Sequence, residues 1–231
     1  MKTITINSMR APELAIDAIH QAPILVQLPT VFVLLAAPTS AGATQLDNLK
    51  TRLPGKNYGT AIGALTKFIG QADSAYLPRE FSRPGHYKML NGSFMRLPFR
   101  NEECESKTIR NGTHQGLLLP VGPYTELFKR IESTFEFYAP DPMWMGKNYC
   151  APLCTSCNVS GDPEGSIVDY EKAQMFAEER GIGLFITATR SSTEKGSYPI
   201  FGFERDTVRI YRDGPGLAAL KTRIPARLST W

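Results

Sequence analysis

Three short polar motifs, far apart in the sequence, carry the residue types that a polyphosphate site needs. They are Lys50-Thr-Arg52, Ser156-Cys-Asn158 and Arg212-Asp-Gly-Pro-Gly216. The lysine and arginines supply fixed cations, the serine and asparagine supply hydroxyl and amide donors, and a glycine turn lets backbone N–H groups approach a ligand closely. Each motif alone is short enough to occur by chance, but each one lies where a predicted helix or strand meets a turn. We therefore predict that the three motifs converge on one nucleotide site.

The composition is that of a mildly basic globular protein. The chain has 231 residues and a mass of 25.6 kDa, with 42% hydrophobic residues, 21% charged residues and a net charge of +4. This length is sufficient for one domain with a sizeable core. The excess positive charge is spread along the chain, which suits an anionic ligand and is compatible with RNA. It is too small to indicate nucleic-acid binding by itself.

The apolar segment 22–43 is interpreted as two buried strands. Its end resembles the cleavage region of a signal peptide, but three prolines interrupt it and Glu13 and Asp17 precede it. It is also too short and too broken for a membrane-spanning helix. We therefore expect a cytoplasmic protein without a membrane partner, in a compartment that keeps thiols reduced.

Strand-like and helix-like segments alternate along the chain. Apolar or alternating runs predict strands at 2–6, 24–27, 31–36, 93–97, 116–119, 151–155, 183–187, 199–203 and 208–211. Predicted helices begin at Pro12, cover 44–51 and 169–180, and include the segment in which apolar residues recur at 124, 127, 128, 131 and 135. The final strands look hairpin-linked, and 70–113 gives little pattern apart from its one strand. The sequence predicts a single α/β domain with a twisted mixed sheet and helices packed around it.

Residues around the polar motifs resemble the signature of one family. Leu28-Pro-Thr30-Val-Phe32 is followed about twenty residues later by Lys50-Thr-Arg52, and then by Thr155-Ser-Cys-Asn-Val-Ser-Gly161. The closing segment 208–216 resembles a final strand with an R-x-G turn. This pattern is similar to that of the YrdC-like family, whose best-known members are threonylcarbamoyl-AMP synthases and which includes domains of other carbamoyl-transfer enzymes. The similarity covers 10–216 and leaves 1–9 and 217–231 as terminal extensions.

The resemblance implies a basic central cleft and a specific reaction. Family members condense threonine, bicarbonate and ATP, with Mg²⁺, into a carbamoyl-adenylate and release pyrophosphate. Carried over to this chain, Lys50, Arg52 and Thr30 form the catalytic set, and no protein-held metal is implied. The residues assigned to the nucleotide are Lys50, Arg52, Ser156, Asn158 and Arg212; those assigned to the amino-acid substrate are Thr30, Phe32 and Thr155.

The chain departs from the family pattern on the amino-acid side. Leu118 stands where the family has an arginine near the amino acid, and Ser197-Tyr-Pro-Ile200 replaces an S-T-V-V segment. Threonine is therefore the default substrate, and a non-catalytic module that binds nucleotide or structured RNA is the alternative. Arginines lie among aromatic residues in the middle of the chain, where they rim the cleft, contact RNA or are simply solvated: Arg79, Arg83, Arg96 and Arg100.

Lys50 and Arg52 have a simpler interpretation as solvated cations at a helix end, where the helix dipole favours them. The presence of the serine–asparagine motif favours the phosphate role instead. On that view both side chains point into a solvated cleft, so their removal would weaken ATP binding with little effect on stability.

The cysteines and Ser156 admit a second kind of chemistry. Cys150-x-x-x-Cys154-x-x-Cys157 has a spacing that resembles cluster-binding motifs, and a four-cysteine zinc site would need Cys104 from a distant loop. Because two of these cysteines flank or occupy a predicted strand, buried structural thiols are the simpler interpretation. Ser156 as a nucleophile lacks support, since none of the three histidines lies in a catalytic motif; they are His20, His86 and His114.

Overall fold

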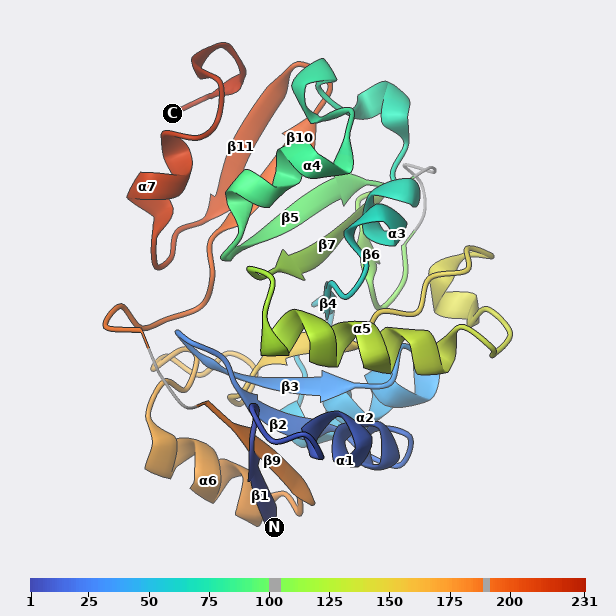
Figure 1. The fold of residues 1–231 in the computed structure, drawn as a ribbon, viewed down its shortest axis with the longest axis vertical. Coiled ribbons are helices and arrows are strands. Elements are labelled where there is room, and N and C mark those ends of the chain that lie inside the picture. Colours follow the sequence, from blue (N-terminus) through green and yellow to red (C-terminus); the bar gives the residue numbers. More distant parts are fainter. Residues whose placement is uncertain (100–104, 189–191) are drawn as a thin grey trace.

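The computed structural model describes residues 1–99, 105–188 and 192–231 and arranges them around an eleven-stranded sheet (Figure 1). The strands are β1 (Lys2–Thr5), β2 (Ile24–Gln27), β3 (Phe32–Ala36), β4 (Gly59–Ala61), β5 (Ser93–Pro98), β6 (Ile109–Arg110), β7 (Thr113–Leu118), β8 (Leu153–Ser156), β9 (Leu184–Thr187), β10 (Ile200–Glu204) and β11 (Thr207–Arg212). The helices are α1 (Ala11–Ile19), α2 (Ser40–Lys50), α3 (Leu65–Gly70), α4 (Pro84–Tyr87), α5 (Pro123–Phe135), α6 (Tyr170–Glu179) and α7 (Leu217–Lys221).

The sheet is mixed, as predicted. Its order is β1-β9-β2-β3-β8-β4-β7-β5-β10-β11, with β6 paired to β7. Parallel pairs join β1 to β9, β2 to β9, β4 to β7 and β5 to β10, and the pairs β2–β3, β3–β8 and β10–β11 are antiparallel. The final two strands form the predicted hairpin. The sequence-predicted α/β class with one mixed sheet is therefore confirmed.

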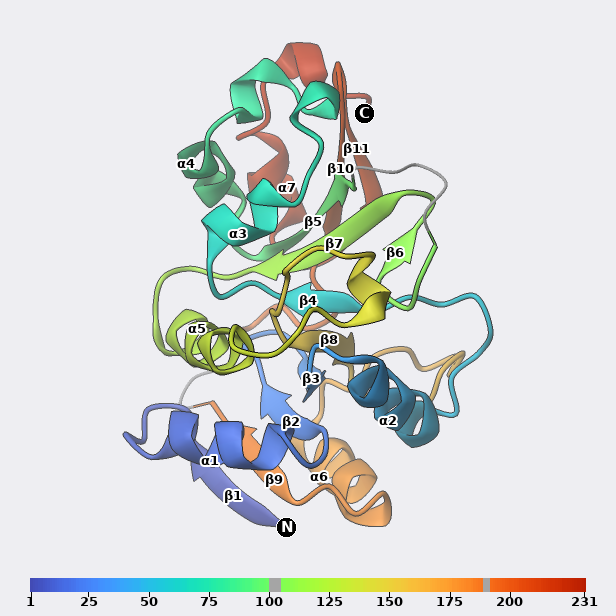
Figure 2. The same cartoon turned by 90° about the vertical axis from the view of Figure 1, so that its right-hand side faces the viewer.

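Helices cover both faces of the sheet, which explains the continuous apolar runs in its central strands. Helices α1 and α5 pack on one face, where Val33 and Leu127 belong to the same core cluster. Helices α2 and α6 pack on the other face, where Leu34 and Phe176 share a second cluster (Figure 2). Every residue of β3 is buried because successive side chains enter opposite cores.

Several elements were not anticipated. The segment between 57 and 92 contains the three-residue strand β4, the short helices α3 and α4, and three 3₁₀ turns. Such short elements carry too few side chains for a periodic pattern, and their pairing partners define them. The ends of the chain also join the fold, because β1 pairs with β9 and the side chains of Leu220, Ile224 and Leu228 are buried in the core. Within the described residues, no helix is long and apolar enough to cross a lipid bilayer.

Helix α5 follows its predicted apolar stripe but also buries one carboxyl group. Glu132 lies among the apolar residues of the helix with 1% of its surface exposed. Its Oε2 accepts a hydrogen bond from the backbone N–H of Ala64 at 2.7 Å, at the start of α3. Burial raises the pKa of Glu132 to about 7, while Lys67 opposes and Glu136 adds to that rise. Glu132 thus links α5 to α3 through this hydrogen bond. Its ionised form is destabilised by burial.

This burial predicts how stability varies with pH. The folded-state pKa lies above the usual value, so the unfolded chain ionises Glu132 first as pH rises. Stability is therefore lost between about pH 4.5 and about 7 and does not recover above that window. Glu132→Gln keeps an acceptor for Ala64 and removes the charge. We expect its melting temperature relative to wild type to increase from pH 5 to pH 8, whereas the exposed control Glu126→Gln gives no such increase. Parallel pH profiles for wild type and Glu132→Gln would contradict the assignment.

Candidate nucleotide site

One residue from each of the three polar motifs lines the same cavity. Arg52, Ser156 and Arg212 all line a cavity of about 220 Å³. Lys56, which the sequence analysis missed, adds a third cation, and no lining residue in the described part of the chain is a carboxylate. A concave surface with cations and no opposing acids attracts anions. The lining residues are Val31, Val33, Arg52, Lys56, Asn57, Gly59, Phe94, Gln115, Cys154, Thr155, Ser156, Ser197, Tyr198 and Arg212.

Helix α2 brings the first motif to this cavity. It begins at Ser40, four residues earlier than predicted, because Thr39 acts as its N-cap and accepts a hydrogen bond from the N–H of Gly42 at 3.0 Å. A side chain at Gly42 would collide with the carbonyl oxygen of Ala37, so a glycine is required there. The helix ends at Lys50, and Thr51 adopts a left-handed conformation with φ of 46°. This turn separates the environments of Lys50 and Arg52.

Lys50 is buried and holds the serine–asparagine loop in place. Its ammonium group donates hydrogen bonds to the carbonyl oxygens of Ser156 and Asn158, the second at 2.7 Å, and to Asn158 Oδ1 at 3.1 Å. Its own carbonyl accepts from the N–H of Ser160 at 2.9 Å. Only 1% of Lys50 is exposed, and burial, aided by Arg52, lowers its pKa to about 7. The expectation that Lys50 points into a solvated cleft is therefore wrong.

Asn158 completes this loop from the other side. Its Oδ1 accepts a hydrogen bond from Ser156 Oγ at 2.7 Å as well as the one from Lys50, and its Nδ2 donates to the carbonyl of Val159 at 2.8 Å. Asn158 is buried, whereas Ser156 lines the cavity. Lys50 and Asn158 therefore hold the conformation of the loop from within, and Ser156 is the residue of the serine–asparagine motif that lines the cavity.

Arg52 is the cation of the first motif that faces the cavity. Its guanidinium donates to the carbonyl of Asn57 at 2.7 Å and to Thr155 Oγ1 at 3.4 Å, and it lies 4.3 Å from the centre of the Tyr58 ring. Burial lowers the pKa of Arg52, and its Nε has no hydrogen-bond partner among the described residues. The group is fixed in orientation and keeps donor capacity for a ligand.

Arg212 reaches the same cavity from the end of β11. Its Nε and Nη2 both donate to the carbonyl of Tyr198, at 3.0 and 2.7 Å. The turn that follows passes so close to the preceding segment that a Cβ at Gly214 would lie 2.3 Å from the carbonyl oxygen of Ser197. Glycine is therefore needed in this turn for the chain to approach the cavity rim. A shallower depression of about 470 Å³, which shares Ser197 with the cavity, lies over this turn.

The predicted amino-acid residues divide between the cavity and the core. Thr155 lines the cavity, while Phe32 lies on the opposite face of β3 with its ring centre 5.9 Å from that of Phe185. Its neighbours Val31 and Val33 face the cavity instead, as strand alternation requires. The structure therefore does not place Phe32 at the site.

Thr30 is buried at the edge of the site. Its carbonyl accepts a hydrogen bond from the N–H of Gly196 at 2.8 Å, and its hydroxyl lies close to the hydroxyl of Tyr198. The nearby Tyr198 lines the cavity, and burial raises its pKa to about 12, with Thr30 opposing that rise. Thr30 is thus a neighbour of the cavity wall and not part of the lining.

Position 118 bears less on the cavity than the family pattern implied. Leu118 packs in the core cluster of α2 and α6, whereas Gln115, three residues earlier on β7, lines the cavity on the other face. A side chain at 118 therefore points away from the cavity, and the absence of an arginine there leaves the charge of the lining unchanged.

The cysteine spacing does not produce a cluster of thiols. Cys154 belongs to the core on one face of the sheet and Cys157 to the core on the other. Burial raises the pKa values of Cys150, Cys154 and Cys157 to about 11, 12 and 12, which keeps all three protonated. Among the described residues, no three His, Cys, Asp or Glu side chains are close enough to share a metal ion. Cys104 and Arg100 lie outside the described residues.

Comparison with known proteins supports the fold. No protein-family model matches this chain, and no curated protein sequence matches it. Among solved structures, E. coli YciO superposes with a TM-score of 0.61 at 13% identity, covering 92% of this chain and 93% of YciO.

Two larger proteins contain the same fold. P. abyssi Sua5, solved in complex with L-threonine, superposes with a TM-score of 0.68 at 15% identity, covering 99% of this chain but 62% of Sua5. Full-length HypF, solved in a phosphate- and nucleotide-bound form, gives a TM-score of 0.59 at 17% identity over 87% of this chain and 28% of HypF. The chain therefore has the YrdC/Sua5-like fold.

The environment of Lys50 predicts a loss of stability on its removal. Lys50→Ala leaves two carbonyl oxygens and the Asn158 amide oxygen without their donor. Leaving buried acceptors unpaired costs about 1–3 kcal/mol each, so we expect the free energy of unfolding to fall by at least about 2 kcal/mol in urea titrations. The exposed cavity residue gives the control, Lys56→Ala, which should change stability by less than about 0.5 kcal/mol. Equal small effects would show that Lys50 does not hold the loop.

Proposed function

We propose that the protein uses Mg-ATP to form a carbamoyl- or acyl-adenylate from bicarbonate and an amino acid, with release of pyrophosphate. The observation that carries this proposal is the cavity in which Arg52, Ser156 and Arg212 converge without any acidic lining residue in the described part of the chain. The fold it shares with a threonine-bound Sua5 structure and a phosphate- and nucleotide-bound HypF structure supports the same ligand classes. Threonine is the first amino acid to test.

The size of the cavity limits which part of the substrates it encloses. At about 220 Å³ it is smaller than the ~300–1,000 Å³ of typical ligand pockets. We infer that it receives the phosphates and the small acid, and that the nucleoside extends over the neighbouring depression formed by 194–197 and 213–215. The two hollows share Ser197, so one nucleotide would span both.

The proposed chemistry is an in-line displacement at the α-phosphorus of ATP. The amino group and bicarbonate form a carbamate with loss of water, and one carbamate oxygen attacks the α-phosphorus while the bond to the bridging oxygen of pyrophosphate breaks. Negative charge increases on the leaving pyrophosphate, where the fixed guanidinium groups of Arg52 and Arg212 would stabilise it. Because the lining offers no carboxylate in the described residues, Mg²⁺ would be held by phosphate oxygens and water, its usual ligands in nucleotide sites.

Substrate identity is tested by pyrophosphate release. The folded protein is supplied with ATP, Mg²⁺, bicarbonate and single amino acids, with threonine first. We expect release that requires both bicarbonate and one amino acid. No release across the whole set of amino acids, from protein that binds ATP, would reject the catalytic part of the proposal.

Nucleotide binding is tested by substitution of the cavity cations. Arg52→Ala should weaken ATP binding by about 1.5–3 kcal/mol in calorimetry, because it removes hydrogen bonds to a charged ligand. Ser156→Ala should weaken the same ligand. The matched control is Arg130→Ala, since Arg130 is exposed on α5 and pairs with Glu126 at 2.8 Å. If Arg52→Ala and Arg130→Ala have the same small effect, the nucleotide does not bind in this cavity.

A non-catalytic RNA-binding role remains the second candidate. A separate depression of about 540 Å³ is lined by three arginines, Arg79, Arg205 and Arg227, and by two carboxylates, Glu80 and Asp206, of which Glu80 pairs with Arg227. RNA phosphates favour such arginine clusters. Tight RNA binding with a steep dependence on salt, together with no pyrophosphate release, would support this candidate over the enzyme.

A further inference from the structure

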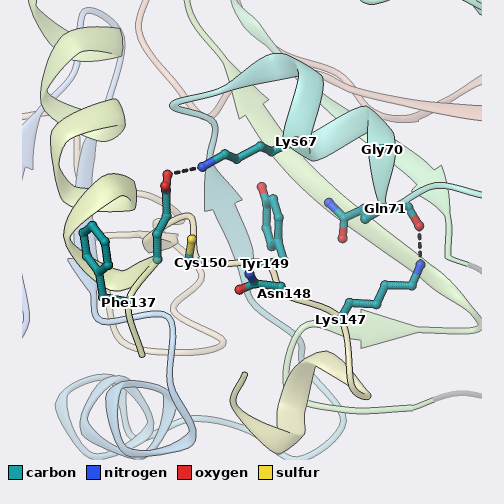
Figure 3. Close-up of a pocket in the computed structure, with 9 residues that line it drawn as sticks. Lys67, Gly70, Gln71, Phe137, Lys147, Asn148, Tyr149 and Cys150 are labelled. Atoms are coloured by element: carbon teal, nitrogen blue, oxygen red, sulfur yellow. Dashed lines mark hydrogen bonds and ion pairs between the residues drawn. The ribbon is translucent and has the colours of Figure 1, made fainter. Parts of the chain in front are cut away.

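A second cavity lies beside the end of α5, away from the candidate nucleotide site. It has a volume of about 520 Å³, within the ~300–1,000 Å³ range of small-molecule sites. Its walls come from the end of α3, the end of α5 and the segment before β8 (Figure 3). It is lined by Lys67, Gly70, Gln71, Glu136, Phe137, Lys147, Asn148, Tyr149 and Cys150. None of these residues lines the candidate nucleotide site.

The most informative group in this cavity is the side-chain amide of Gln71. Only 5% of Gln71 is exposed, and neither its Oε1 nor its Nε2 makes a hydrogen bond of good geometry within the described residues, although the amide lies near enough to the Tyr149 hydroxyl to oppose the rise in the pKa of Tyr149 that burial causes. Tyr149 lies beside it, but the Tyr149 hydroxyl pairs with Thr60 Oγ1 at 3.1 Å. Buried amide atoms in native proteins almost always have partners. The Gln71 amide therefore presents one donor and one acceptor, side by side, to whatever enters the cavity.

Several contacts hold the backbone at Gln71 in place. The Lys147 ammonium donates to the backbone carbonyl of Gln71 and lies 3.7 Å from the centre of the Phe99 ring. Gln71 directly follows α3, and the start of that helix is held by the hydrogen bond from Ala64 to Glu132. A donor–acceptor pair that projects from a held backbone loses less conformational freedom when it binds a ligand.

The pairing requirement selects the chemistry of the ligand. A carboxylate offers only acceptors and an ammonium only donors, so each would leave one Gln71 atom unpaired. A nucleobase edge offers a donor next to an acceptor, and glutamine pairs with adenine in this bidentate manner. Two ammonium groups, of Lys67 and Lys147, lie on the lining against the single carboxylate of Glu136. This balance favours an anionic substituent on the same ligand.

We propose that the cavity around Gln71 is a second ligand site, and that it binds a nucleoside monophosphate through its base edge. The site is independent of the proposed function, since it does not require catalysis or an occupied central cavity. It nevertheless adjoins that cavity, because Gly59 lines the central cavity and the next residue, Thr60, bonds to Tyr149 on the other face of β4. A ligand on Gln71 would thus lie one strand away from the phosphates of a nucleotide in the central cavity.

The experiment follows the Gln71 side chain by NMR. The side-chain NH₂ signals are assigned by their loss in Gln71→Met, and AMP is titrated into Arg52→Ala protein, which lacks a cation of the central cavity. We expect the Gln71 signals to shift in a saturable manner, with at least tenfold weaker AMP binding in Gln71→Leu. Inorganic phosphate alone should bind at least tenfold more weakly than AMP. The control Gln174→Leu, on the surface of α6, should leave binding unchanged.

Three results would overturn the proposal. The first is an unchanged Gln71 signal at saturating AMP, and the second is AMP binding that Gln71→Leu does not weaken. The third is a Gln71 shift caused by an N-carbamoyl amino acid and not by AMP, which would make the ligand a urea-like acid. If Gln71→Leu fails to fold, the titration of Arg52→Ala protein still decides between these outcomes.

Discussion

The arrangement of the candidate nucleotide site depends on one buried ammonium group. Lys50 ends α2 and donates to the oxygens of Ser156 and Asn158, so the end of a helix and the loop after β8 have a fixed separation. The lysine is nearly inaccessible, and burial lowers its pKa to about 7, so the loop holds its charge at an energetic penalty. The neighbouring turn at Thr51 then directs Arg52 toward the cavity instead of the loop. One residue organises the loop and the other presents charge to a ligand.

The sheet separates two large cores in the described part of the molecule. Residues of β4 and β7 alternate, so Gly59 and Gln115 face the candidate nucleotide site while Thr60 and His114 form a buried hydrogen-bonded pair at 3.0 Å on the other face. Burial lowers the pKa of His114 to about 4, which keeps it neutral and fit for this structural role. Thr60 also bonds to the Tyr149 hydroxyl at 3.1 Å, so β4 connects the candidate nucleotide site, at Gly59, with a residue that lines the second cavity.

Much of the fold and part of the site could be predicted from sequence. Apolar runs located the central strands and the stripe on α5, because burial on both faces or on one face leaves a strong periodic signal. The chemistry of the motifs assigned Arg52, Ser156 and Arg212 to one anionic ligand, because they supply cations and hydrogen-bond donors. In the structure all three line the same cavity. Short elements such as β4 gave no signal, because their neighbours in the sheet define them.

The errors have physical causes as well. A lysine at a helix end looks the same in sequence whether it points to solvent or into a loop, so the burial of Lys50 was not predictable. Phe32 was assigned by resemblance, although alternation along β3 places Val31 and Val33 at the cavity and Phe32 in the core. When a strand is buried on both faces, its sequence does not show which side chains point to which face of the sheet, because both sets are apolar.

A structure of the protein with Mg²⁺ and a non-hydrolysable ATP analogue would show whether the nucleotide binds in the cavity that Arg52, Ser156 and Arg212 line. We expect phosphate oxygens in contact with Arg52, Ser156 and Arg212, while the Lys50 ammonium stays on the carbonyl oxygens of Ser156 and Asn158. An analogue bound away from this cavity would contradict the site. A Lys50 side chain that leaves the loop for the phosphates would contradict the division of roles between Lys50 and Arg52.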